Sequence, residues 1–295
     1  MNKIHHINHK INFIKKHSPK EFHDIIRRIC FERFAFNIND RYDFLNDKQI
    51  GGRVSKELIQ EYKGYKFRIH IEKQDDITIN ILTHNVNPLF CGIIDINKKG
   101  KVAALINISS YKNCTIPDLI NKGGSIILNF IIGFLKLNKN SLGINRIVLR
   151  DNSTKFCNKC PEQINMAMMY TLLYGDTWYG KYGFRPYDTM QNKPYQPHVD
   201  SYNKNKNIIQ NAKVIDVNLI KYFKDAVKLF KLTDINTEHF DKLFIVWKDK
   251  PLSQILRVLL KDYDKYCCIF TYISKKIYDE LGLFPFSELP FYLDI

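Results

Sequence analysis

The segment YGDTWYGKYGFRPYD, residues 174–188, concentrates aromatic side chains among glycines just past the end of a predicted helix. Trp178, Tyr179 and Tyr182 are the residues in it that could carry chemistry. A phenol has an ordinary pKa of about 10 and stays protonated at neutral pH, so a buried tyrosine can donate a proton to a leaving group. The alternative is structural, because aromatic side chains flanked by glycines often fill a packed corner.

A second candidate is the segment NKGGS, residues 121–125, which precedes an apolar helix. Gly123 and Gly124 permit close approach of the backbone, and the free N–H groups at a helix start attract an anion. The segment could therefore hold a phosphate group. Two glycines before a helix are also typical of an ordinary turn, which is the alternative.

The cysteines offer a third pattern, because CNKC at residues 157–160 has the spacing of a zinc knuckle. A structural zinc site needs four ligands, and the adjacent Cys267 and Cys268 are poor partners by their spacing. We therefore expect structural cysteines and no metal site. The seven cysteines are an odd number at irregular places, which predicts a reducing compartment without a disulfide framework.

The elements that would position these residues follow from hydrophobic periodicity. A helix is predicted after Ser18 and Pro19, where apolar residues recur at helical spacing. From Gly64 the period changes to two, which predicts four antiparallel strands in succession up to about residue 109. Gly100 suits the turn between the last two of these strands.

Helices and a strand alternate after this point. A helix follows Gly124 and carries an apolar stripe made of Ile127, Phe130, Ile131, Phe134 and Leu135. Residues 144–153 predict a strand that ends in polar side chains, and residues 161–175 predict a helix that Gly175 terminates. We therefore expect an α+β fold with a mixed, mostly antiparallel sheet flanked by helices.

The formal net charge of the 295-residue chain is +15, and the excess of Lys and Arg is spread along it. Such a field attracts phosphate-bearing partners, whether nucleic acid or a phosphorylated small molecule. The alternative is that a chain rich in Lys, Asn and Ile reflects an AT-rich coding genome, and that its charges form a solvated surface. The longest apolar stretch, residues 125–135, is far shorter than the roughly 20 residues that cross a bilayer, so we expect no membrane span.

The chain contains, in order, a strand, a glycine loop that opens a helix, a second strand, a second helix and the segment WYGKYGFRP. This order resembles that of the Gcn5-related N-acetyltransferase (GNAT) family. The specific match is TWYGKYGF, in which Tyr179, Lys181, Gly183 and Phe184 stand where the family has them. The tryptophan before this tyrosine, after LRDNS, resembles GNAT-like proteins of large DNA viruses. The high content of Lys, Asn and Ile, which AT-rich codons encode, also suits that source.

The resemblance implies a domain organisation. A flexible tail over residues 1–17 precedes a GNAT-like domain over residues 18–190. The Pro- and Asn-rich segment 191–207 is interpreted as a linker or long loop. Residues 208–295 are expected to be a mainly helical extension that contains one strand-like segment, KLFIVWK.

The resemblance also implies acetyl transfer from acetyl-coenzyme A (acetyl-CoA), as co-substrate, to an amine acceptor that the sequence does not identify. Tyr179 would protonate the departing thiolate, and Asp151 has the position that best suits a base. Backbone N–H groups of a strand and of a helix start would hold acetyl-CoA. These belong to Ile106, Asn107 and Ile108, and to Lys122, Gly123, Gly124, Ser125 and Ile126.

A second class of function fits the same pattern. A catalytically inactive GNAT-like binding module would use its basic surface to bind nucleic acid or an acidic protein partner. A third class, a structural or virion-associated protein, has no direct sign in the sequence. In each case we expect an intracellular protein, in the cytoplasm of a host cell or in a virion.

Overall fold

The computed structural model describes residues 54–73, 76–83, 90–108, 114, 123–161, 163–188, 191, 193–287 and 289–295. They form two units: unit 1 lies within Met1–Asn145 and includes Ile295, and unit 2 is Arg146–Asp294. This division falls before the segment 191–207, where the sequence suggested a boundary. The predicted tail over residues 1–17 and the helix expected after Ser18 lie outside the described residues.

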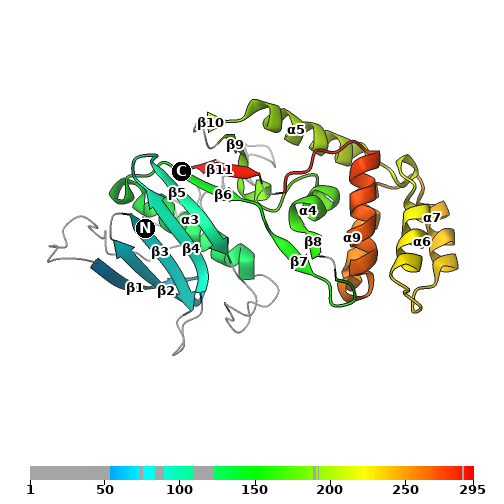
Figure 1. Cartoon of the computed structure of the whole chain (residues 1–295), viewed down its shortest axis with the longest axis horizontal. Helices are drawn as coiled ribbons and strands as arrows, with labels where there is room; N and C mark the ends of the chain where they lie inside the picture. The colour runs from blue at the N-terminus through cyan, green and yellow to red at the C-terminus, as the bar shows by residue number, and fades with distance from the viewer. Residues whose placement is uncertain are drawn as a thin grey trace, which may run out of the picture. The chain divides into compact units, whose positions relative to one another are not determined.

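Unit 1 is built on an antiparallel meander, because alternate residues of its strands are apolar and turn toward one buried face. Phe67, Ile69, Ile79 and Ile81 are fully buried on the central strands. The four predicted strands are confirmed as β2 to β5, whereas β1 was not predicted. The strands pair in chain order (Figure 1) as β1 (Val54–Tyr62), β2 (Tyr65–Lys73), β3 (Ile77–Thr83), β4 (Phe90–Asn97) and β5 (Val102–Ile108).

The turn between β4 and β5 places a lysine, not the glycine, in the left-handed conformation. Lys101 has φ 53°, and its N–H donates to the carbonyl oxygen of Lys98 at 3.2 Å. The N–H of Gly100 donates to Oδ1 of Asn97 at 2.8 Å. Gly100 therefore lies in the predicted turn, but the positive φ falls on the next residue.

Helix α3 (Gly123–Leu142) covers one face of these strands (Figure 1). Its predicted apolar stripe is confirmed, since Ile127, Phe130, Ile131, Phe134 and Leu135 are all buried. Phe130 stacks on Phe67 of β2 with ring centroids 4.5 Å apart. A Cβ atom on Gly92 of β4 would lie 2.9 Å from Cδ1 of Ile131, so a larger residue there would require the end of this side chain to shift.

Unit 2 contains a small antiparallel sheet whose spatial order differs from its chain order. Strand β11 (Pro290–Asp294) lies between β6 (Arg146–Arg150) and β9 (Arg185–Asp188), and β9 also pairs with β10 (Lys193–Pro194). Tyr292 of β11 is opposite Val148 on one side and Arg185 on the other. The sequence predicted β6 but placed residues 290–294 in a helical region. A separate hairpin joins β7 (Thr154–Phe156) to β8 (Gln163–Asn165).

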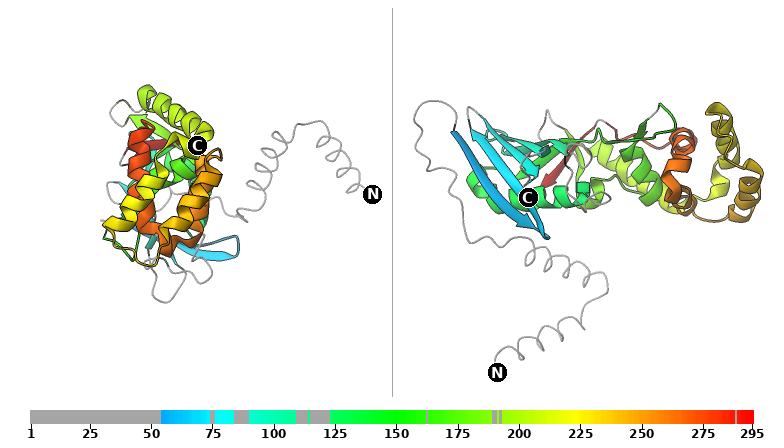
Figure 2. Two further views of the ribbon diagram at one scale, coloured as in Figure 1. Left: turned by 90° about the vertical axis from the view of Figure 1, so that its right-hand side faces the viewer. Right: turned by 90° about the horizontal axis from the view of Figure 1, so that it is seen from below.

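The rest of unit 2 is helical, as predicted for most of the C-terminal part. Helix α6 (Leu219–Leu229) packs against α9 (Tyr263–Glu280) and α7 (Thr237–Trp247) (Figure 2), while α4 (Met166–Tyr174) packs against α5 (Gln196–Asn211) and α8 (Leu252–Leu259). Phe223, Phe240 and Phe244 form an aromatic group at the α6–α7 contact, with 4.4 Å between the ring centroids of Phe223 and Phe240.

The segment interpreted as a linker, 191–207, is largely helix α5, so this interpretation of its local structure is wrong. Pro197 occupies the first turn of the helix, where a missing N–H costs nothing. Asn205 is buried, accepts from the N–H of Phe284 at 3.0 Å and donates to its carbonyl oxygen at 2.8 Å. An asparagine that satisfies a distant backbone segment resembles a loop residue in the sequence alone.

The strand-like segment KLFIVWK is also helical, because it lies in α7. Asn236 caps this helix by accepting from the N–H of His239 at 3.1 Å. Phe240 and Phe244, four residues apart, are buried, whereas Ile245 and Val246 are exposed. A short apolar run does not distinguish a strand from a helix by periodicity, and here the packing on one helical face decides.

Four of the seven cysteines form two disulfides, Cys91–Cys114 and Cys157–Cys267. The expectation of no disulfide framework is thus not met, because pairing over separations of 23 and 110 residues leaves no local pattern in the sequence. The fold confirms a mixed α+β class with mostly antiparallel strands and a helical C-terminal part. Among the described residues, every helix is too short or too polar to span a membrane.

Candidate functional site

The aromatic segment begins where helix α4 ends. The side chain of Asn165 caps the start of α4 by accepting from the N–H of Met168 at 3.0 Å. Gly175, the predicted stop, adopts φ 69° and donates its N–H to the carbonyl oxygen of Thr171 at 2.8 Å. The helix therefore stops sharply, and the chain enters the segment that carries Tyr179.

Tyr179 lies in a cluster of aromatic rings and is only 8% exposed. Its ring meets Trp178 edge-on at 4.7 Å and Phe184 at 5.8 Å between centroids. The ammonium group of Lys181 lies over the rings of Trp178 and Tyr182 at 5.3 Å and 4.9 Å. The cluster fixes the orientation of the Tyr179 phenol. It is also a packed aromatic corner, which is the structural alternative predicted for this segment.

The backbone next to Tyr179 is held by side chains. The N–H of Gly180 donates to Oγ1 of Thr177 at 2.9 Å. The guanidinium of Arg185 donates to the carbonyl oxygens of Gly180 and Phe184 at 3.0 Å and 2.7 Å. Gly183 then adopts φ 95°, which turns the chain into strand β9. These contacts make the peptide after Tyr179 a rigid support for its ring.

Asp151 follows strand β6 and is fully buried. The hydroxyl and the N–H of Ser153 both donate to its Oδ1, the latter at 3.3 Å. Its Oδ2 is buried and has no hydrogen-bond partner among the described residues. A buried carboxylate oxygen without a donor is rare in proteins and marks a place where an external group could bind.

The pKa values of these two residues are displaced. Burial raises the pKa of Asp151 from its ordinary value of 3.8 to about 6, although the Ser153 hydrogen bonds oppose the shift. Burial also raises the pKa of Tyr179 well above 10, and the negative charge of Asp151 adds to this. Asp151 therefore exchanges a proton near neutral pH, while Tyr179 keeps its proton. Such a pair suits general base and general acid chemistry.

In unit 1, the predicted backbone groups Ile106, Asn107 and Ile108 lie at the end of β5. Asn107 is opposite Ile93 and Leu105 is opposite Ile94, so Ile106 is an additional residue that opposes no β4 residue. The Ile106 side chain is 60% exposed. A bulge of this kind bends a strand and redirects backbone groups, and bulges are frequent next to active sites.

The helix start predicted to hold a phosphate is described only in part. Gly123, Gly124, Ser125 and Ile126 form the first turn of α3, which contacts β5, whereas Lys122 lies outside the described residues. The side-chain amide of Asn129 donates to the carbonyl oxygen of Ser125 at 2.8 Å. The structure thus brings the unit 1 candidates onto two contacting elements, and places Asp151 and Tyr179 in unit 2, close enough for the charge of Asp151 to act on the Tyr179 phenol.

The cysteines of unit 2 form a further group, for which the sequence predicted no metal site. Cys157, Cys160 and Cys268 have their Sγ atoms within 4.8 Å of one another, and Cys267 is bonded to Cys157. The spacing of CNKC was the only signal for this group. Nothing in the sequence indicated that Cys267 and Cys268 would reach it, because contacts over more than a hundred residues depend on the helical packing of unit 2.

Comparison with protein-family models, with curated proteins and with solved structures finds no match to this chain.

Proposed function

We propose that the chain transfers an acetyl group from acetyl-CoA to an amine, with a GNAT-like arrangement of its elements. The observation that carries this proposal is the buried pair in unit 2. The pKa of Asp151 is raised to about 6, and the phenol of Tyr179 is held protonated within range of the charge of Asp151. Aminolysis of a thioester needs a group that accepts a proton near neutral pH and another that donates one.

Each residue would have one step. The nitrogen of the neutral amine acceptor attacks the thioester carbonyl carbon, and the Asp151 carboxylate takes one proton from that nitrogen, directly or through water, as the bond forms. As the C–N bond forms, the carbonyl π bond opens, and the tetrahedral intermediate then collapses with cleavage of the C–S bond. Tyr179 donates its proton to the leaving thiolate, so the products are an amide and free coenzyme A. Proton exchange with solvent then returns Asp151 to the carboxylate and Tyr179 to the phenol.

Two features of unit 1 support binding of the acyl donor, acetyl-CoA. The bulge at Ile106 lies in the strand whose backbone N–H groups were expected to polarise the thioester carbonyl. Helix α3 begins at Gly123, next to the residues expected to receive the pyrophosphate. The chain order of β5, α3, β6, α4 and the Tyr179 segment is also the order for which the resemblance was stated.

The test is calorimetric titration of the full chain with acetyl-CoA at low and at high salt. We expect saturable binding that is abolished when Gly123 and Gly124 are replaced by bulky residues. Gly100→Ala is the matched control, because a Cβ atom there meets only ordinary contacts at 3.5 Å. Turnover is then followed by the free coenzyme A thiol released with a panel of polyamines and basic peptides. Folded protein that gives no heat at either salt contradicts the proposal.

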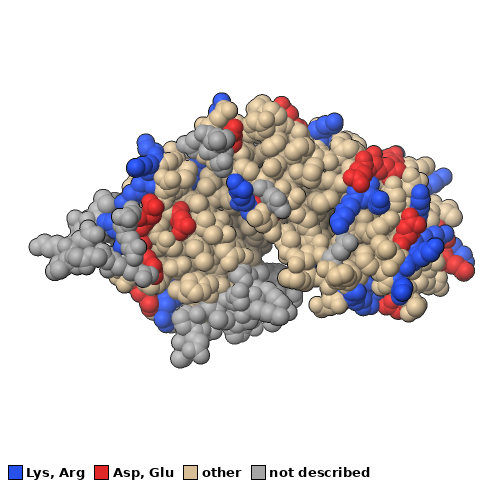
Figure 3. Space-filling view, in the orientation of Figure 1, with Lys and Arg blue, Asp and Glu red and all other residues tan. Residues whose placement is uncertain are grey.

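The alternative, a binding module for nucleic acid or an acidic protein, rests on the net charge of +15. Ion pairs neutralise part of this charge locally, as between Lys159 and Asp234 at 3.1 Å and between Lys224 and Asp241 at 2.7 Å. Figure 3 shows basic and acidic groups interspersed on one face of the helical part of unit 2. Binding of an oligonucleotide that weakens steeply with salt, without acetyl-CoA binding, would favour this alternative.

A further inference from the structure

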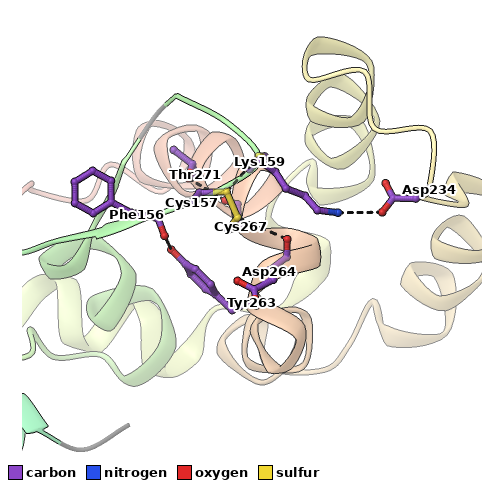
Figure 4. Close-up of a disulfide and its surroundings, with 9 residues drawn as sticks. Phe156, Cys157, Lys159, Asp234, Tyr263, Asp264, Cys267 and Thr271 are labelled. Carbon is purple, nitrogen blue, oxygen red and sulfur yellow. Dashed lines mark hydrogen bonds and ion pairs between the residues drawn. A yellow bond between two sulfur atoms is a disulfide. The ribbon is translucent and has the colours of Figure 1, made fainter. Parts of the chain in front are cut away.

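Four cysteine side chains converge at one place in unit 2, and Figure 4 shows the two of them that form the disulfide. Cys157 and Cys160 come from the connection between β7 and β8, and Cys267 and Cys268 come from the second turn of α9. The Sγ atoms of Cys157 and Cys268 are 3.3 Å apart, and those of Cys157, Cys160 and Cys268 lie within 4.8 Å of one another. Cys267 is joined to Cys157 by the disulfide.

The disulfide accounts for only two members of this cluster. Cys160 and Cys268 are not in a disulfide, yet Cys268 is 1% exposed and Cys160 is 9% exposed. A pair bonded for stability alone does not require two more thiols at the same buried point. Cysteines on unrelated elements that meet in this way are typical of metal sites, where one ion orders all four sulfur atoms.

The spacing of three of the four sulfur atoms is compatible with zinc, while the fourth belongs to the disulfide. A Zn–S bond length of about 2.3 Å in a tetrahedral site places the sulfur atoms roughly 3.8 Å apart. The distance of 3.3 Å between Cys157 and Cys268, and the limit of 4.8 Å for the three sulfur atoms, bracket this value. The two-residue separation of Cys157 and Cys160 in a turn between strands is the usual form of a zinc knuckle.

Two lysines lie close to the CNKC turn in the chain. Four thiolates around a divalent cation would carry a net charge of −2, which positive groups nearby would partly offset. Lys159 lies within the knuckle, and Lys155 has its ammonium group 3.4 Å from the centre of the Tyr263 ring at the start of α9. Cys267 and Cys268 lie near the N-terminal end of α9, whose dipole favours negative charge.

We propose that Cys157, Cys160, Cys267 and Cys268 bind one Zn²⁺ ion when the chain is reduced. The Cys157–Cys267 disulfide is then the oxidised, metal-free form of the same cluster. A dithiol reductant supplies two electrons and two protons to this disulfide and becomes a disulfide itself, which leaves four thiols. Binding of Zn²⁺ releases the four thiol protons and forms four Zn–S bonds. The site is structural, since four protein ligands leave no open position.

The consequence for unit 2 is a cross-link between the β7–β8 hairpin and helix α9. In this region Oη of Tyr263 donates to the carbonyl oxygen of Phe156 at 2.8 Å, and Lys159 pairs with Asp234 (Figure 4). These are exposed contacts that contribute little by themselves. A zinc ion would hold the hairpin where these contacts form. Zinc binding at this cluster does not depend on the proposed acetyl transfer.

The test uses the full chain purified with a dithiol and analysed for zinc by atomic emission. We expect one zinc ion per chain, and replacement by Co²⁺ to give the intense visible absorption of tetrahedral thiolate coordination. Cys160→Ser and Cys268→Ser each lose the metal, whereas Cys114→Ser in unit 1 keeps it. Alkylation with mass spectrometry is expected to show Cys157 and Cys267 protected until a chelator is added.

Three results would overturn the proposal. The first is reduced wild-type protein that binds neither Zn²⁺ nor Co²⁺ with thiolate absorption, a measurement that does not depend on whether a variant folds. The second is zinc binding at one ion per chain that survives both Cys160→Ser and Cys268→Ser. The third is a Cys157–Cys267 disulfide that persists in dithiol-treated, zinc-loaded protein.

Discussion

The hydroxyl of Ser153 donates a hydrogen bond to Oδ1 of Asp151, and Oδ2 of the same carboxylate stays buried without a donor among the described residues. One oxygen therefore orients the side chain while the other remains available to a proton or a ligand. Water would solvate both oxygens of an exposed aspartate, so the arrangement has a cost to the folded state. That cost depends on pH and can be measured.

Asp151→Asn is expected to change how stability depends on pH. The pKa of Asp151 is raised in the folded chain from 3.8 to about 6, so the folded state binds the proton more tightly than the unfolded state. The free energy of unfolding therefore falls as pH rises through this interval and stays low at pH 7. A shift of about two units corresponds to an upper bound of roughly 3 kcal/mol. The Asp151→Asn variant has no carboxyl group to titrate at this position. Its free energy of unfolding relative to wild type should therefore be higher at pH 7 than at pH 4.

Urea unfolding at the two pH values measures this difference. The matched control is Asp200→Asn, which removes an exposed carboxylate on α5 that accepts a hydrogen bond from Gln196. A stability difference between Asp151→Asn and wild type that is the same at both pH values would contradict the burial of a charged carboxylate at this position.

Tyr179→Phe is expected to lower kcat for acetyl transfer by about 10²-fold, the usual contribution of a positioned general acid. The substitution keeps the ring contacts with Trp178 and Phe184, so the fold should be unaffected. Tyr182→Phe is the control, because it removes a phenol from the same cluster. Equal rates for the two variants would assign Tyr179 to packing alone.

The pH profile of the same reaction tests Asp151. If its carboxylate is the base, kcat/KM rises with pH and reaches a plateau above pH 6, because the pKa of the carboxyl is about 6. Asp151→Asn should remove this rise along with most of the activity. An unchanged rise in the variant would show that another group titrates.

Gly180→Ala is expected to destabilise unit 2. A Cβ atom at this position would overlap Oδ1 of Asp176 and the hydroxyl of Tyr202, which leaves the added methyl no space. Overpacking of this kind costs about 1–3 kcal/mol. Thermal or urea unfolding measures the loss, with Gly100→Ala as the control. Equal stability of the two variants would be inconsistent with the packing around Gly180.

Asn205→Ala should lower the free energy of unfolding by about 3 kcal/mol, because it leaves the N–H and the carbonyl oxygen of Phe284 without partners. Asn207→Ala, an exposed position on the same helix, is the control. A loss no larger than that of the control would mean that water replaces the side chain at both groups.

Local patterns predicted the elements that depend on neighbours in the sequence. Strands β2 to β5 alternate with period two, and Phe130 and Phe134 lie on the predicted face of α3, because each pattern is set by one buried side. The choice of Asp151 came from its place after a strand. Its burial could not be predicted, since exposure depends on how distant segments of unit 2 pack.

Errors arose where tertiary contacts override local composition. Asn205 lies in a segment with the composition of a loop, but it forms two hydrogen bonds with the backbone of Phe284. This contact helps to hold helix α5 in place. Ile245 and Val246 favour a strand, yet Phe240 and Phe244 bury one helical face. The local pattern also could not predict that the packing of α9 brings Cys267 and Cys268 to the CNKC turn.

The position of β11 between β6 and β9 has a consequence for the order of folding. Arg146 and Asp294, which form an ion pair across β6 and β11, are 148 residues apart in the chain. A contact of such high sequence separation has a large loop-closure entropy unless the intervening helices have already condensed. We therefore expect a folding intermediate in which the helices of unit 2 are packed while β6 and β9 still expose open edges. Such edges pair readily with other chains, so refolding yield should fall as protein concentration rises.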